Sequence, residues 1–269
     1  MPRMQTRATR HIVVTTSWDD DDRSGLKVAK LLGAKKIPGT FYVQSGRLAE
    51  GTHLTAADLR ALTADGFEIG GHTVSHKVLT SLSPQDMARE VGECKQVLQD
   101  ATGREVTAFC YPKGRFNPEV VQQVKRAGYL GARSTLMLCS NREFDHFEMP
   151  TTVQAYPHRR INYVRNLVRL RAFPTLLKSA PDLFQFQSWL QLGKMMFDRV
   201  LRKGGIWHMY GHPWEIERLG LWSQLSEMLE YVANRKDVTY LTNGQLLSPP
   251  GREACAAAEK PGTRQFTNA

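Results

Sequence analysis

The chain has few cysteines, and their spacing argues against a disulfide framework. Its 269 residues include four, at Cys94, Cys110, Cys139 and Cys255, and none of them forms a CxxC pair. Scattered cysteines of this kind are typical of reduced thiols. No apolar run approaches the roughly 20 residues that span a bilayer, and the basic start MPRMQTRATR lacks the apolar core of a secretory signal. We therefore expect a cytoplasmic protein with a basic tail over residues 1–10.

Acidic residues are scarce relative to basic ones. The chain has 36 Lys and Arg against 26 Asp and Glu, a formal charge of +10. From Thr151 to Pro181 there is no acid at all, and the bases there are Arg159, Arg160, Arg165, Arg169, Arg171 and Lys178. A basic excess indicates an anionic partner. Nucleic acid is not expected, because no groove-reading motif is present.

The basic segment has a helical pattern with two interpretations. Apolar residues recur on one face, and Arg165 and Arg169 fall on another. The plainer interpretation is a helix that covers the domain and exposes a solvated basic edge. The alternative is a surface, Arg159–Lys178, that docks on anionic lipid or on a lipid-linked, phosphate-bearing sugar. An enzyme peripheral to the membrane would follow from the second interpretation.

Short apolar strands alternate with helical patterns along the chain. Predicted strands cover residues 12–17, 39–43, 67–70, 108–111, 130–133, 205–209 and 238–241. Predicted helices cover residues 25–32, 55–62, 83–99, 117–128, 187–201 and 220–232. This alternation favours an α/β fold with a parallel sheet or a β/α barrel. We expect one catalytic domain over residues 11–248, with a basic helical insertion at about 155–200, and a disordered tail over residues 249–269.

Polar residues cluster where several predicted strands end. Asp19–Asp22 follow the first strand, and His72 and His76 follow the third. The motif YPKGR follows the fourth strand, and WHMYGHPWE follows a late one. Because active sites of β/α folds gather at the carboxyl ends of the strands, these clusters predict one shared site.

His72 and His76 are candidate metal ligands. Their i, i+4 spacing can place both imidazoles on one face, and one aspartate would complete a two-histidine, one-carboxylate site. A surface or capping histidine pair is the plainer alternative. The helix that follows the aspartates explains Asp21 or Asp22 through its N-terminal dipole, but it does not explain Asp19 and Asp20. One of these two would bind the metal and the other would accept a proton.

The late strand offers a candidate acid. His208 follows the apolar run GGIW, and it is predicted to protonate a leaving group, although a satisfied core histidine is the alternative. His212 and Glu215 would orient it or shape the pocket. Trp207 and Trp214 would be either sugar-stacking platforms or core residues.

Together these motifs resemble the polysaccharide deacetylase family, which has the NodB-homology fold of carbohydrate esterase family 4. The family's Thr-Phe-Asp-Asp-Gly is similar to SWDDD at 17–21, and its His-Ser/Thr-x-x-His is similar to HTVSH at 72–76. Its Arg-x-Pro-Tyr-Gly is partly matched by CYPKG at 110–114, and its Leu-x-His by IWH at 206–208. The resemblance extends over about residues 11–245 and points to a less characterised branch of the family.

The resemblance implies a distorted (β/α)7 barrel and a metal-dependent hydrolase. The reaction would remove an N- or O-linked acetyl group from a sugar, as a carbon–nitrogen hydrolase in the first case. Asp19 would be the base and His208 the acid, and the divalent metal would be held by Asp20, His72 and His76. Zinc is expected first, with cobalt, nickel or manganese as alternatives. Substrate and oxyanion contacts are expected from Tyr111, Pro112, Lys113, Gly114, Arg115, Trp207, His212 and Trp214.

Two residues depart from the family pattern. Asp21 stands in place of the motif's glycine, and Cys110 stands where the family has the arginine that pairs with the base. Arg115 is a candidate to replace that arginine. The loss at Cys110 also supports a different hypothesis, a non-catalytic member that only binds a glycan. For an enzyme inside the cell, a nucleotide-linked or polyprenyl-phosphate-linked acetylated sugar is the expected substrate.

Overall fold

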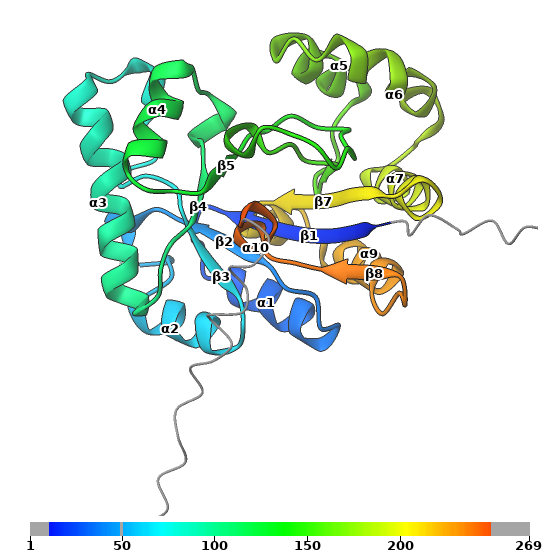
Figure 1. Cartoon of the computed structure of the whole chain (residues 1–269). Coiled ribbons are helices and arrows are strands. Elements are labelled where there is room, and N and C mark those ends of the chain that lie inside the picture. The colour runs from blue at the N-terminus through cyan, green and yellow to red at the C-terminus, as the bar shows by residue number, and fades with distance from the viewer. Residues whose placement is uncertain (1–10, 49–50, 249–269) are drawn as a thin grey trace, which may run out of the picture.

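Parallel strands form one curled sheet in the computed structural model, which describes residues 11–48 and 51–248 (Figure 1). The order along the sheet is β5 (Gly131–Arg133), β4 (Ala108–Cys110), β3 (Glu68–Gly71), β2 (Thr40–Val43), β1 (Ile12–Asp19), β7 (Gly205–Gly211) and β6 (Val153–Gln154). β8 (Val238–Tyr240) pairs with the N-terminal half of β1. It lies on the same side of β1 as β2, which pairs with the C-terminal half. The predicted α/β fold and its distorted barrel are confirmed.

Helices cover the outside of this sheet. They are α1 (Gly25–Ala34), α2 (Ala56–Ala64), α3 (Pro84–Thr102), α4 (Pro118–Arg126), α5 (Arg160–Arg169), α6 (Phe173–Gln185), α7 (Trp189–Lys203), α8 (Pro213–Arg218), α9 (Trp222–Val232) and α10 (Asn243–Leu247). Short 3₁₀ turns are η1 (Ser45–Arg47), η2 (Leu79–Ser81), η3 (Pro112–Gly114) and η4 (His146–Glu148). The predicted cap of α2 is present: Thr55 and Asp58 form a reciprocal capping box.

The long third helix begins as its sequence predicts. The Ser83 side chain accepts a hydrogen bond from the backbone N–H of Asp86, and Pro84 occupies the first turn, where it has no N–H to lose. At the other end Gly103 adopts a left-handed conformation with φ of 66° and ends the helix. These local signals explain why both ends of α3 were predictable within a few residues.

β7 is longer than the sequence predicted, and this changes the site. The prediction ended the strand at residue 209, but the strand continues to Gly211 because Met209 and Tyr210 are also buried in it. In the register with β1, His208 pairs with Thr15 and Gly211 pairs with Trp18. His208 therefore lies inside the strand, and His212 is the first residue beyond its carboxyl end.

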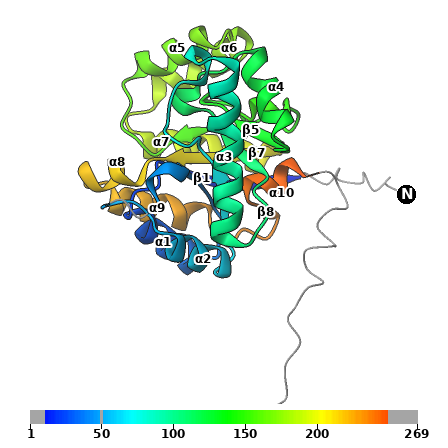
Figure 2. The same cartoon turned by 90° about the vertical axis from the view of Figure 1, so that its left-hand side faces the viewer.

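Residues 155–200, predicted as a basic helical insertion, contain α5, α6 and most of α7. α7 packs against β6 and β7, whereas α5 and α6 lie at one end of the molecule, away from the main run of the sheet (Figures 1 and 2). β6 was not predicted, and the predicted helical insertion is divided into the separate helices α5, α6 and α7. None of the described helices is long and apolar enough to cross a membrane.

Some predictions concern residues that the structure does not describe. The basic tail over residues 1–10, the tail over residues 249–269 and Cys255 all lie outside the described ranges. The other three cysteines, Cys94, Cys110 and Cys139, are free and buried. This arrangement agrees with the expectation of reduced thiols for these three residues.

Candidate active site

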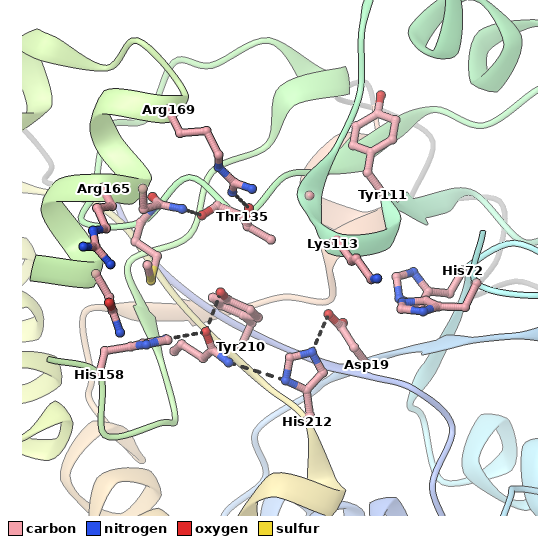
Figure 3. A pocket seen from close by; sticks show the side chains of 16 residues that line it. Asp19, His72, Tyr111, Lys113, Thr135, His158, Arg165, Arg169, Tyr210 and His212 are labelled. Carbon is pink, nitrogen blue, oxygen red and sulfur yellow. Dashed lines mark hydrogen bonds and ion pairs between the residues drawn. The ribbon is translucent and has the colours of Figure 1, made fainter. Parts of the chain in front are cut away.

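A cavity of about 420 Å³ opens at the carboxyl ends of the strands (Figure 3). Several predicted site residues line it, although they are distant in sequence: Asp19, His72, His76, Tyr111, Lys113, Gly114 and His212. Its volume lies within the range of sites for small ligands, about 300–1,000 Å³. Residues at the carboxyl ends of β1, β3, β4 and β7 therefore meet in one cavity.

Asp20, His72 and His76 are arranged as metal ligands. Their candidate ligand atoms all lie within 4.8 Å of one another. Asp20 Oδ1 is 3.6 Å from His72 Nε2 and 3.5 Å from His76 Nε2. Two atoms bound at about 2.1 Å to a tetrahedral ion would lie about 3.4 Å apart, so these residues fit a divalent ion.

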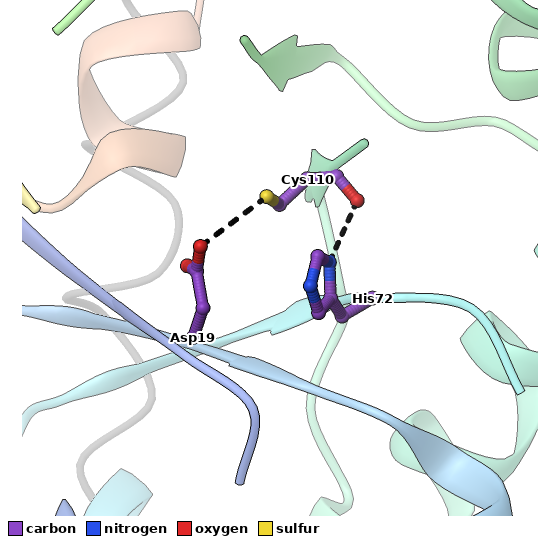
Figure 4. Close-up of side chains that lie close together, drawn as sticks. All are labelled: Asp19, His72 and Cys110. Carbon is purple, nitrogen blue, oxygen red and sulfur yellow. Dashed lines mark hydrogen bonds between the residues drawn. The ribbon is translucent and has the colours of Figure 1, made fainter. Parts of the chain in front are cut away.

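Neighbouring groups hold the three candidate ligands in position. His72 Nδ1 donates a hydrogen bond to the Cys110 carbonyl at 2.8 Å, which leaves Nε2 free on the side of Asp20 (Figure 4). Gln44 Nε2 donates to Asp20 Oδ1 at 3.1 Å, and Trp214 Nε1 donates to Asp20 Oδ2 at 3.0 Å. Although burial raises the pKa of Asp20, the hydrogen bond and charge of His72 outweigh it and hold that pKa well below its usual range.

Unusual backbone conformations are concentrated around this centre. Asp20, Asp21, His76 and Lys113 have positive φ values of 76°, 43°, 57° and 55°, a region that side chains with a Cβ rarely adopt. Asp21 occupies the glycine position of the family motif. Its Oδ1 accepts a hydrogen bond from the backbone N–H of Gln44 at 3.2 Å, and this contact compensates part of the strain of the turn.

Arg133 forms an ion pair with Asp19, the contact for which Arg115 was the predicted candidate. Its guanidinium donates to Asp19 Oδ2 and lies 4.6 Å from the centre of the Tyr210 ring. Both partners are buried, and Asp19 Oδ1 has no hydrogen-bond partner among the described residues. The proposed replacement, Arg115, is exposed and is not among the residues that line the cavity. That part of the prediction is wrong.

Arg133 enters the site from a strand that was predicted. It is the last residue of β5, so it lies at the same sheet edge as Asp19. The rule that selected the other clusters, a polar residue at a strand's carboxyl end, could therefore have found it. Cys110 lies between the two. Its thiol is 3.9 Å from Asp19 Oδ2 (Figure 4), and it is 2.8 Å from Arg133 Nη2.

The structure does not bring His208 to the cavity. Its Nδ1 donates to the Pro150 carbonyl at 3.0 Å, and its Nε2 accepts from Ser17 Oγ at 2.9 Å. Burial lowers the pKa of His208 to about 3, so near neutral pH the ring is neutral and lacks the imidazolium proton of a general acid. His208 is thus the satisfied core histidine of the alternative interpretation.

His212 takes the place predicted for His208. Its Nδ1 donates to Glu215 Oε2 at 2.7 Å, and its Nε2 lies 3.8 Å from Asp19 Oδ2 and 3.9 Å from Asp20 Oδ2. Burial alone would lower the pKa of His212, but the hydrogen bond to Glu215 and the two aspartates raise it above its ordinary value. From the sequence, His212 and Glu215 were predicted only to orient another acid or to shape the pocket.

The remaining predicted contact residues divide into two groups. Trp207 is fully buried and donates a hydrogen bond to the Gly193 carbonyl at 3.0 Å, so it is a core residue and offers no surface to a sugar. Pro112 is buried and does not line the cavity. Tyr111 lines the cavity while its hydroxyl donates to the Phe147 carbonyl at 2.9 Å. Lys113 and Gly114 also line the cavity.

Two glutamines near the site were not predicted. Gln44, which bonds Asp20, comes directly after β2, a strand whose end was predicted, whereas Gln154, which lines the cavity, ends the unpredicted strand β6. Gln154 Oε1 accepts hydrogen bonds from the Tyr210 hydroxyl and from His158 Nε2, both at 2.7 Å, and its Nε2 donates to Glu215 at 3.2 Å. Gln154 therefore connects β6 and β7 to the residue that holds His212.

Comparison with known proteins agrees with this geometry. Residues 6–132 match the model of the polysaccharide deacetylase family. The resemblance to that family is confirmed. YxkH of Bacillus subtilis, which carries the same family name, is 25% identical over 118 residues, or 44% of this chain and 41% of its own. A chitooligosaccharide deacetylase of Rhizobium leguminosarum is 24% identical over 119 residues, or 44% of this chain and 54% of its own. The matches thus cover about half of these relatives or less.

Solved structures extend the likeness to the whole fold. A Mycobacterium smegmatis protein of the polysaccharide deacetylase type has a TM-score of 0.61 at 14% identity, over 98% of this chain and 96% of its own. A family 4 pseudoenzyme from Bacillus anthracis has a TM-score of 0.53 at 18% identity, over 89% of this chain and 66% of its own. Because a pseudoenzyme shares the fold, the fold alone does not establish activity, and the argument rests on the site.

Proposed function

We propose that this chain is a metal-dependent hydrolase that removes an N- or O-linked acetyl group from a sugar. The observation that carries the proposal is one cavity in which the ligand set Asp20, His72 and His76 lies beside Asp19 and His212. The relatives support carbohydrate substrates, since their names refer to peptidoglycan and to chitooligosaccharides.

The residues divide the reaction between them. A divalent ion, zinc first among the candidates, would polarise the acetyl carbonyl and make a nearby water molecule more acidic. Asp19 Oδ1 accepts the proton of the attacking water, while Arg133 holds the other carboxylate oxygen. His212, oriented by Glu215, donates a proton to the leaving nitrogen or oxygen of the sugar. The products are acetate and the deacetylated sugar. The turn at Tyr111–Gly114 lines the cavity and would stabilise the negative charge that develops on the carbonyl oxygen.

A non-catalytic glycan-binding role is the competing hypothesis. Its support was the missing arginine at Cys110, and Arg133 removes that support because it makes the corresponding ion pair from β5. The assay that separates the two measures acetate release from a panel of acetylated sugars, before and after treatment with a chelator. We expect release that stops with the chelator and returns with zinc. Sugar binding without release under any divalent metal would favour the glycan-binding role.

We also propose that the protein works in the cytoplasm at an anionic membrane surface. Among the described residues, seven large apolar side chains are exposed, and five of them are on α5 and α6: Ile161, Val168, Phe173, Leu177 and Phe184. Leu177 and Phe184 are the most exposed, at 77% and 78%. Such a concentration of exposed apolar area is unusual for a free surface.

The charge around these apolar residues favours an anionic lipid bilayer as the partner. The same two helices and their flanks carry the six bases of the Arg159–Lys178 segment, and no acid occurs between Thr151 and Pro181. Basic residues beside an apolar helical face are typical of helices that lie in a membrane interface. Arg165 and Arg169 of α5 also line the cavity, so docking would place its mouth near the lipid headgroups.

Vesicle co-sedimentation tests the membrane proposal. We expect binding to phosphatidylglycerol vesicles that weakens at high salt, and little binding to phosphatidylcholine vesicles. The double variant Leu177→Ser/Phe184→Ser should lose binding, whereas Leu219→Ser, which changes an exposed apolar residue outside α5 and α6, should not. Equal binding of both variants, or no binding by the unaltered protein, would contradict the proposal.

A further inference from the structure

Three cationic side chains line the cavity without an acidic partner in an ion pair. They are Lys113 from η3 and Arg165 and Arg169 from α5 (Figure 3). In the described part of the chain, the ion pairs of lysine and arginine involve other residues. The acid that lines this cavity is Asp19, which Arg133 already pairs. The wall therefore presents positive charge that the protein itself does not neutralise.

The wall is held in a defined position. Asn166 Oδ1 accepts from the backbone N–H of Met137 at 3.1 Å, and Asn166 Nδ2 donates to the Thr135 carbonyl at 2.8 Å. These two bonds tie α5 to the loop that follows β5. Arg169 Nη2 donates to Thr135 Oγ1 at 3.0 Å, which fixes its guanidinium at the edge of the same loop.

The turn that carries Lys113 packs against this loop as well. A Cβ on the next residue, Gly114, would lie 2.0 Å from Thr135 Oγ1, and Gly114 has a φ of 61°. Only glycine permits this approach. Thr135 is thus the shared contact that sets Lys113 and Arg169 on adjoining parts of the cavity wall. The spacing of Arg165 and Arg169, four residues apart on α5, places both on one helical face.

We propose that this wall is a subsite for a phosphate group carried by the acetylated sugar substrate. Arg165 and Arg169 repel one another at this spacing, and Lys113 adds a third positive charge to the cavity. An anion bound between the arginines and the lysine best accounts for this unpaired charge. Guanidinium groups match the oxygens of a phosphate with paired hydrogen bonds, and a lysine adds a point charge. Asn162 and His158 line the same side and supply polar groups for the rest of the ligand. The inference rests on the proposed deacetylase function and names the class of its substrate.

Binding measurements without turnover test the subsite. Calorimetry in the presence of chelator would compare N-acetylglucosamine, its 1-phosphate, and uridine diphosphate N-acetylglucosamine. We expect both phosphate-bearing probes to bind at least about tenfold more tightly than the neutral sugar, with an advantage that shrinks at high salt. The two phosphate probes distinguish a monoester from a pyrophosphate linkage. Equal dissociation constants for all three probes would overturn the proposal.

Matched variants assign the effect to the wall. Arg165→Ala/Arg169→Ala should abolish most of the difference between the neutral and the phosphate-bearing probes. Arg126→Ala/Arg142→Ala removes the same charge from exposed positions outside the cavity and should preserve the difference. If the difference is lost in Arg126→Ala/Arg142→Ala as well, or is kept in Arg165→Ala/Arg169→Ala, the effect is general electrostatics and the subsite is refuted.

The outcome is separable from that of the proposed function. Phosphate-dependent binding without acetate release under any metal would refute the deacetylase and leave the subsite standing. Acetate release with the same kcat/KM for neutral and phosphate-bearing sugars would leave the deacetylase standing and refute the subsite.

Discussion

Replacement of His212 by glutamine is expected to lower kcat for acetate release by about 10²–10⁴-fold, the usual contribution of a general acid. Nε2 of His212 lies within 4 Å of Asp19, and its other nitrogen is held by Glu215 at 2.7 Å. Because His208 lies in the core, His212 is the histidine expected to donate this proton. The measurement is a steady-state assay of the variant with its metal content verified.

His208→Gln is the matched control for this prediction. His208 hydrogen-bonds Ser17 and the Pro150 carbonyl inside the sheet, so its replacement is expected to reduce thermal stability while the folded fraction keeps most of its kcat. The account is contradicted if folded His208→Gln loses activity and His212→Gln retains it. That result would restore the assignment made from the sequence motif alone.

Replacement of Arg133 by methionine is expected to have a large effect on stability. Asp19 is 4% exposed and Arg133 is fully buried, and removal of one member of a buried ion pair costs about 3–5 kcal/mol because the other charge is left uncompensated. Urea unfolding would measure this loss. Acetate release should also fall, because Asp19 would no longer be held by its Oδ2 atom.

Two further variants separate the ion pair from general damage. The double variant Asp19→Asn/Arg133→Met should be less destabilised than the sum of its single variants, because each single variant leaves a lone buried charge and the double variant leaves none. Arg115→Met, which changes the exposed arginine first considered for this role, should unfold like the unaltered protein. A stable and active Arg133→Met protein would show that the pair with Asp19 is dispensable.

Much of the fold was predictable because local signals and hydrophobic pattern agree. Strand and helix alternation predicted the parallel sheet, and residues such as Thr55 and Pro84 marked helix starts that the structure reproduces. The irregular middle was harder. β6 has only two residues, Val153–Gln154, too few to display the alternation of a strand. The helical pattern of the basic segment was visible, but its division into α5 and α6 was not.

The site was predictable to the extent that strand ends were placed correctly. Asp19, Asp20, His72 and His76 come from strands whose ends were predicted within two residues, and the structure brings them together. His208 was misplaced because the strand was predicted to end at residue 209, whereas it continues to Gly211. Two residues of strand length decide which histidine reaches the cavity.

The pairing of Asp19 with Arg133 could not be read from the motif itself. The motif places an arginine at the end of the fourth strand, where this chain has Cys110, and β5 lies beside that strand in the sheet. Side chains from neighbouring strand ends can reach the same point, so the charge is supplied one strand further along. The family match ends at residue 132, just before the residue that makes this contact.

The central claim is that Asp20, His72 and His76 hold a divalent ion, and metal analysis of the purified protein tests it most directly. After loading with zinc and dialysis, we predict one bound ion per chain and its loss in Asp20→Asn. Asp22→Asn should keep the ion, because Asp22 hydrogen-bonds Ser24 at the start of α1 and does not belong to the ligand set. A protein that binds no ion, or an Asp20→Asn variant that retains it, would contradict the account.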